Sequence, residues 1–188
     1  MTFYDYKVNS SKRTWKFNKI VTADVMNIEY IHPLKQKIIV EMVEKAQWER
    51  GLLYMCMMVN RSRVSIKKSK DALETFEICN GEEWLDSACF DAQQAIAFLL
   101  KGILLEYGVV FEKIHDVNYL VALLDDTDFQ FSKHDDLIML SSTITSWEEG
   151  SRYGKGIRTS VNTVRRIHNI YENILNAFLE VQEKNQQE

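Results

Sequence analysis

The sequence predicts an all-α protein, an antiparallel bundle of about five helices that follows an N-terminal extension. Among its 188 residues there are one proline, Pro33, and seven glycines, and so few helix breakers favour long helices joined by short loops. Hydrophobic residues make up 46% and charged residues 27%, as in an ordinary globular protein that buries one core. After Pro33 the apolar residues recur mostly at helical spacing.

Residues 1–51 carry the weakest pattern and are predicted to form the N-terminal extension. The segment KIVTADVMNIEYI, residues 19–31, is rich in β-branched and aromatic residues, which predicts a short strand. Apolar residues at helical spacing follow Pro33, so the extension should end in one helix. Gly51 is expected to loosen that helix before the bundle begins.

The bundle is predicted to span residues 52–183. Its first two helices should be separated at Asn80-Gly81, a good C-cap followed by acids that suit a helix N-terminus. The last residues, 184–188, should fray. The five helices are expected at residues 52–78, at 83–107, from about 115, at 134–153 and at 159–181.

Charge, cysteines and hydropathy predict a soluble, cytoplasmic protein. The net charge of −4 does not indicate a nucleic-acid binder. The three cysteines have no CxxC spacing and no secretory segment precedes them, so they are expected to be reduced. The longest apolar run, Leu52–Val59, has eight residues, far short of the roughly 20 that span a bilayer. No motif predicts a cofactor, and the histidines and cysteines are too scattered for a metal site.

The segment SACFDAQQAIAFLLKG, Ser87 to Gly102, combines small apolar residues with two glutamines and a lysine. On a helix its alanines form a stripe that lets a neighbouring helix approach closely, while Gln94 and Lys101 lie two turns apart beside that stripe. Two interpretations are open. Both polar side chains reach solvent at the edge of the bundle, or they form one wall of a site.

Three segments, in this order, match one family pattern. The helix CFDAQQAIAFLLKGILLEYG is followed by His115-Asp116 at an expected helix start, and SRYGKG follows the fourth helix. The set resembles the HEPN domain, an α-helical family named for nucleotide binding, over roughly residues 55–183. The matching residues are Phe90, Ala92, Gln93, Gln94, Ala95, Leu100, Lys101, His115, Asp116, Arg152 and Tyr153.

Three positions depart from the family pattern. Ala97 stands where the family usually has Glu, Val117 replaces the Leu after His-Asp, and Gly154 replaces the Pro after Arg-Tyr. The missing carboxylate leaves Lys101 freer to meet an anion. If Lys101 belongs to a site, its ammonium should be partly buried and should face Asp116 or the Arg152–Tyr153 segment, because a buried ammonium needs a partner.

The resemblance implies a non-catalytic module that recognises a nucleotide or a phosphorylated partner, related to toxin–antitoxin proteins. Within it, Lys101 and Arg152 would hold phosphate, Tyr153 would stack or pack, and Asp116 would orient Arg152 or cap its helix. The implied partners are a second copy of the chain, as a homodimer, and a minimal nucleotidyltransferase that the module would regulate. The implied site residues are Gln94, Lys101, His115, Asp116, Arg152 and Tyr153.

Many HEPN proteins are metal-independent ribonucleases or toxins, whose signature is an Arg and a His about four to six residues apart near the start of the last helix. The nearest such pair here, Arg165 and His168, has only two residues between them. We therefore expect no enzymatic activity. One alternative is a ribonuclease with this displaced Arg165–His168 pair, and another is a purely structural dimerisation module.

Basic residues gather in two segments, one on the first bundle helix and one between Gly150 and Tyr171, which contains no acid. Each is either a solvated face that balances acids elsewhere or a patch that meets phosphate. RNA is a partner that this pattern permits but does not favour. The candidate basic patch consists of Arg61, Arg63, Lys155, Arg158 and Arg165.

Overall fold

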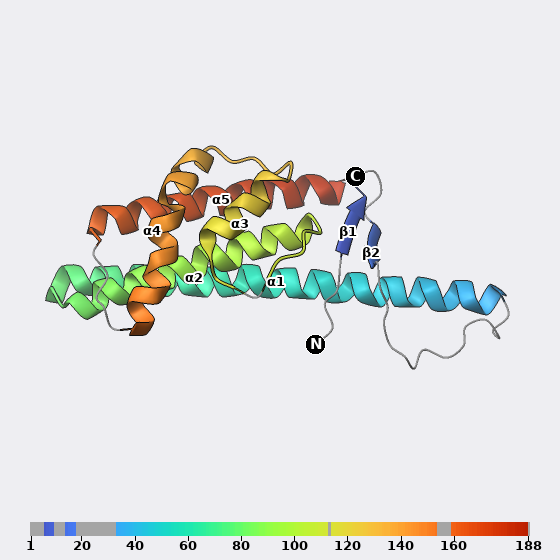
Figure 1. The fold of residues 1–188 in the computed structure, drawn as a ribbon, viewed down its shortest axis with the longest axis horizontal. Helices are drawn as coiled ribbons and strands as arrows, with labels where there is room; N and C mark the ends of the chain where they lie inside the picture. The colour runs from blue at the N-terminus through green and yellow to red at the C-terminus, as the bar shows by residue number, and fades with distance from the viewer. Residues whose placement is uncertain (1–5, 10–13, 18–32, 113, 154–158, 188) are drawn as a thin grey trace.

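The computed structural model describes residues 6–9, 14–17, 33–112, 114–153 and 159–187. Side chains are described at 50–112, 114–148, 150 and 159–185. The described chain forms a small β-hairpin and five helices, which confirms the predicted all-α bundle (Figure 1). The elements are β1 (Tyr6–Asn9), β2 (Thr14–Phe17), α1 (Pro33–Cys79), α2 (Glu82–Glu106), α3 (Val117–Asp125), α4 (His134–Tyr153) and α5 (Val161–Gln187).

Helix α1 is longer than the sequence indicated. It runs for 47 residues without interruption, so the expectation of a loosened helix at Gly51 was wrong. A glycine inside a helix costs only about 1 kcal/mol relative to alanine, and the helical residues on both sides propagate through it. The helix predicted for the extension is therefore continuous with the first helix of the bundle, and it extends well beyond the other helices (Figure 1).

The two ends of the chain also differ from expectation. The described strands pair antiparallel with Tyr6 opposite Phe17 and Asn9 opposite Thr14, upstream of the predicted strand. That strand, at 19–31, lies outside the described residues. At the other end α5 continues to Gln187, so the tail predicted to fray is helical up to that residue.

The turn between α1 and α2 is the one that the sequence predicted. Asn80 adopts the left-handed conformation with φ of 54°, and its N–H donates to the carbonyl of Phe76 at 2.8 Å. This satisfies a carbonyl at the end of α1, as a C-cap residue does. Gly81 then caps α2, whose first turn carries Glu82 and Glu83. The turn sends α2 back along α1.

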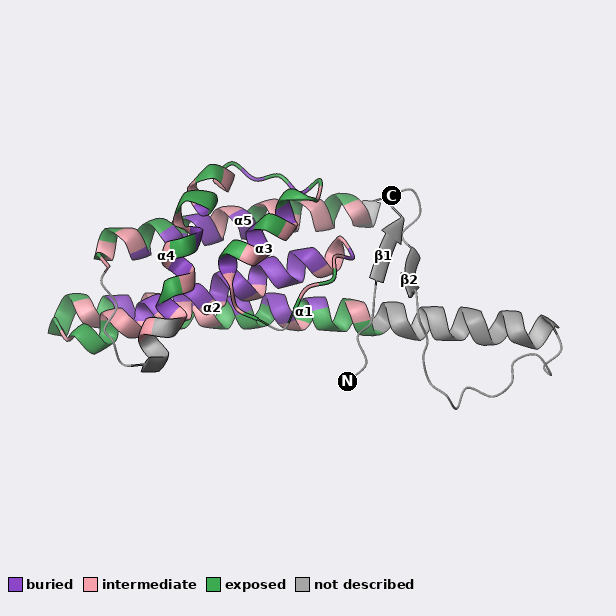
Figure 2. Ribbon diagram, in the orientation of Figure 1, coloured by how far each residue is buried: buried purple, intermediate pink, exposed green. Residues whose placement is uncertain are grey.

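Helix α2 forms the centre of the core (Figure 2). Its stripe of small residues, Ala88, Ala92 and Ala95, is completely buried, and α1 packs against it. The two helices approach closely at Gly102, where an added Cβ would lie 2.9 Å from Cγ2 of Val59. Large side chains complete the core, among them Leu137, Trp147, Tyr171, Ile174 and Phe178.

Helix α2 is the one described helix whose length and composition would allow it to span a membrane. However, 72% of its most apolar window is buried inside the bundle. Its hydrophobicity is thus explained by its central place in the core, since an all-round apolar helix is typical of a buried core position.

Two glycine substitutions should change the stability in opposite directions. Gly51→Ala should raise the free energy of unfolding by about 0.5–1 kcal/mol, because alanine is the better helix former and no atom lies within 4 Å of the new Cβ. Gly102→Ala gains the same propensity but pushes α1 from α2 at Val59, and should lower stability by about 1–2 kcal/mol overall. Urea unfolding of the two variants measures both effects. Equal stabilisation by both would contradict a close contact at Gly102.

Candidate functional site

The two adjacent glutamines of α2 connect this helix to the start of α3. Gln93 is completely buried, and its Nε2 donates to the carbonyl of His115 at 2.7 Å. Gln94, which is half-buried, donates from Nε2 to Oε1 of Gln93 at 2.6 Å. Gln94 therefore belongs to the site by way of Gln93, which was not among the predicted site residues.

His115 also contacts the aromatic ring that lies one turn beyond Gln94. The rings of Phe98 and His115 meet edge to face with centroids 5.3 Å apart. On the other side, the guanidinium carbon of Arg61 lies 5.7 Å from the centroid of Phe98, within the range of a cation–π interaction. The structure thus brings Arg61 of α1 close to the α2 residues.

Asp116 caps α3, as one of its predicted roles required. Its carboxylate accepts from the N–H of Tyr119 at 3.2 Å and from the hydroxyl of Thr145 at 3.3 Å. Thr145 in turn accepts from the N–H of Val117 at 3.0 Å. The cap therefore fixes α3 against α4.

Lys101 is buried, with 5% of its surface exposed. Burial lowers the pKa of its ammonium, and the negative charge of Glu148 on α4 partly offsets this. The interpretation that Lys101 lies in solvent is wrong. The carboxylate that acts on it is Glu148, whereas we expected Asp116, and Asp116 is engaged in capping α3. Glu148 was missed in the sequence, although it lies four residues before the matched Arg152.

We call the polar residues where α2 meets α3 and α4 the α2–α3–α4 junction: Gln94, Lys101, His115, Asp116 and Glu148. Gln94 reaches His115 through Gln93, whereas Lys101 is linked to Glu148 by charge. Of the other predicted site residues, Arg152 and Tyr153 end α4, and Arg152 follows Glu148 by one helical turn. Their side chains lie outside the described residues, as do Lys155 and Arg158 altogether.

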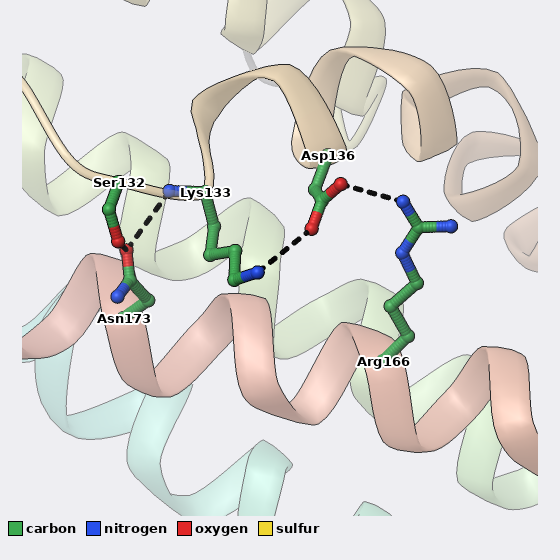
Figure 3. A network of polar contacts seen from close by, with 5 residues as sticks. All are labelled: Ser132, Lys133, Asp136, Arg166 and Asn173. Carbon is green, nitrogen blue, oxygen red and sulfur yellow. Dashed lines mark hydrogen bonds and ion pairs between the residues drawn. The ribbon is translucent and has the colours of Figure 1, made fainter.

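The basic residues of α5 do not join this junction. Arg165 forms an ion pair with Glu77 of α1. Arg166 pairs with Asp136 at 2.6 Å, and Lys133 reaches the same carboxylate at 3.4 Å (Figure 3). The hydrogen bond from Arg166 is the main reason why the pKa of Asp136 is lowered. Arg165, which was predicted to belong to the candidate basic patch, is thus already paired with a carboxylate.

His168 is a buried residue of the contact between α1 and α5, with 8% of its surface exposed. The hydroxyl of Ser69 donates to the carbonyl of Ala88 at 2.6 Å, so it must accept the hydrogen bond of 2.7 Å that joins it to Nε2 of His168. Nε2 therefore carries the proton of a neutral ring. The pKa of His168 is lowered to about 4, mainly by burial and also by the charge of Lys70, while the charge of Glu172 opposes the shift.

The fold is that of an all-α bundle whose described residues hold a polar cluster beside a central apolar helix. A family model of the HEPN domain matches residues 62–182, which is more than half of the chain. The chain therefore belongs to the HEPN domain family, and this supports a module of the nucleotide-binding or ribonuclease type in general. No curated protein and no solved structure matches the chain.

Acid should destabilise the protein through His168. Its pKa is about 4 in the folded chain and about 6.5 when unfolded, so between these values the unfolded state binds more protons. The contribution of His168 to the free energy of unfolding is fully present above about pH 6.5. It is lost as the pH falls towards 4, which lowers that free energy by on the order of 2–3 kcal/mol. Urea unfolding across this pH range should show that the free energy of unfolding depends less steeply on pH in His168→Gln than in the wild type. The surface variant His134→Gln should keep the His168 slope, and parallel curves for wild type and His168→Gln would contradict the assignment.

Proposed function

We propose that this protein is a non-catalytic binding module that recognises a nucleotide or another phosphorylated molecule at the α2–α3–α4 junction. The observation that carries the proposal is the buried side chain of Lys101, where burial lowers the pKa of the ammonium and the charge of Glu148 offsets this only in part. Burial of a cation is costly unless negative charge accompanies it. A bound phosphate would supply that charge.

The other groups of the junction suit the same ligand. Gln94 is half-buried and its amide nitrogen donates to Gln93, so this amide lies at the edge of the site. Arg152 lies one turn beyond Glu148 on α4, and an arginine at that position suits bidentate binding of phosphate. Phe98 and His115 add aromatic surface beside them, which is what a nucleotide base stacks on.

The described contacts favour binding over catalysis. A general acid or base must reach the reacting phosphate, but His168 is buried against Ser69 and Arg165 is held by Glu77. The alternative ribonuclease with this displaced pair would need both contacts to break. The predicted homodimer and the nucleotidyltransferase partner stay predictions of the family resemblance.

Ligand binding at Lys101 is tested by thermal unfolding with AMP, ATP, GTP and inorganic phosphate. A ligand at a hundred times its Kd should stabilise the wild type by about 2.7 kcal/mol, and Lys101→Met should lose this gain because it keeps the length of the side chain but removes the charge. Lys67→Met, at an exposed lysine of α1, is the matched control. The double variant Lys101→Met/Glu148→Gln avoids leaving the half-buried carboxylate of Glu148 without the charge of Lys101.

Two outcomes would refute the proposed site. In one, a nucleotide raises the melting temperature of the wild type and of both Lys101 variants equally. In the other, none of the four ligands shifts the wild type at millimolar concentration.

Purified protein should leave single-stranded RNA intact. The reason is the burial of His168, which cannot meet a scissile phosphate while it is bonded to Ser69. Incubation of labelled RNA with the protein, with and without EDTA, measures this. Degradation that His168→Ala abolishes and Lys67→Met retains would establish the ribonuclease instead.

A further inference from the structure

A groove runs along the face of α1 that no described helix covers. Its volume is about 570 Å³. Leu53, Met57, Asn60 and Val64 line it from α1, at the three- and four-residue spacing of one helix face, and Phe98 of α2 forms its side. Leu53 is 71% exposed and Val64 is 57% exposed. Apolar side chains this open on one face mark a contact surface.

Exposed cations flank this groove, and within the part of the chain that the structure describes they form no ion pairs. Among the described residues, no ion pair joins Arg61, Arg63, Lys67 or Lys68 to a carboxylate. Basic residues elsewhere on the bundle do have such pairs, for example Lys70 with Glu172 at 2.7 Å. Burial raises the pKa of Asp91 on α2 and the charge of Lys68 partly offsets this, but the two side chains form no ion pair within the described chain.

We propose that this groove docks an amphipathic helix of a partner protein, with apolar residues on one face and acidic residues beside them. The apolar lining would receive the apolar face, and the acids would pair with Arg61 and Lys68, both of which line the groove. From Leu53 to Val64 the stripe rises by roughly 16 Å, which fits about three turns of a helix lying along α1. The proposal does not depend on the nucleotide site.

The charge and the apolar stripe of the groove favour this partner over two other occupants, a second copy of the chain and a nucleic acid. A second copy packed antiparallel about the middle of the stripe would bring Arg61 close to the same residue of its partner, and like charges at an interface cost free energy. A nucleic acid would satisfy the cations, but its phosphates would leave Leu53, Met57 and Val64 exposed, and those side chains form the apolar stripe that α1 contributes to the lining. An acidic amphipathic helix satisfies both features.

The test uses the full chain and two labelled synthetic helical peptides of about 18 residues, or five turns. Both carry the same leucine stripe, flanked by glutamates in one and by lysines in the other. Fluorescence anisotropy should show binding of the glutamate peptide at least about tenfold tighter than of the lysine peptide. Val64→Glu should weaken binding of the glutamate peptide by at least about tenfold, since it places an acid in the apolar lining.

Charge reversal and a matched surface change complete the experiment. Arg61→Glu combined with Lys68→Glu should reverse the preference for the glutamate peptide, so that the lysine peptide binds more tightly. Met139→Glu is the control, because Met139 of α4 is an apolar residue that is 67% exposed and lies outside the groove. Circular dichroism verifies that each variant is folded.

Four results would overturn the proposal. The first is equal binding of the two peptides, and the second is binding of the glutamate peptide that Val64→Glu leaves unchanged. The third is a homodimer in light scattering that Val64→Glu dissociates, which would make a second copy the occupant. The fourth is binding of a single-stranded RNA that both the Arg61/Lys68 reversal and Val64→Glu abolish, which would assign the groove to nucleic acid.

Discussion

The close packing of α2 against α1 is the constraint on which the rest of the structure depends. The completely buried alanines of α2 and the bare backbone at Gly102, where an added Cβ would meet Val59 at 2.9 Å, allow the two helices to approach. Helix α2 can then be enclosed by α3, α4 and α5 (Figure 2). Enclosure has a chemical consequence, since any polar side chain that α2 buries must find a partner inside the protein. Gln93 finds the carbonyl of His115, and Lys101 meets the charge of Glu148.

A polar seam joins α1 and α5 on another side of the same helix pair. Ser62 is hydrogen-bonded to Tyr171 at 3.0 Å and Ser69 to His168 at 2.7 Å. Ion pairs of Lys70 with Glu172 and of Glu77 with Arg165 continue it towards the end of α1. Buried hydrogen bonds of this kind fix the register of two helices, because breaking one leaves an unsatisfied group. The residues that suggested a ribonuclease thus have a structural role in the described chain.

The face of α1 that carries the groove lies opposite this seam, and no described helix covers it. It exposes apolar side chains and cations that form no ion pair with a carboxylate of the described residues. This face begins where Phe98 separates the groove from the α2–α3–α4 junction. Phe98 contacts His115 on one side and Arg61 on the other, so a substitution of Phe98 would disturb both surfaces. Lys101 and Val64 each belong to one surface only, which is why they separate the two proposals experimentally.

By itself the sequence determined the fold class and most helix boundaries, because these depend on local rules. The apolar period, the single proline and the Asn80-Gly81 cap placed α2 and α4 within a residue or two of their observed ends. The ordered motifs indicated the family, and the structure places Gln94, His115 and Asp116 where α2 meets α3. The prediction of a loosened helix at Gly51 was wrong because the effect of a glycine depends on how strongly the residues on both sides form a helix. A short stretch of sequence around the glycine does not contain this information.

Only the tertiary structure decided which polar groups meet. Gln93 and Glu148 became partners of the site, and Arg165 was assigned to Glu77, through contacts between helices that are far apart in sequence. Helical spacing put Lys101 beside the alanine stripe, but it could not distinguish a solvated edge from a buried position, since that depends on whether α4 covers this face. The groove on α1 follows from the same cause. Whether an apolar stripe is core or surface is fixed by the helices that pack on it, and on this face none of the described helices does.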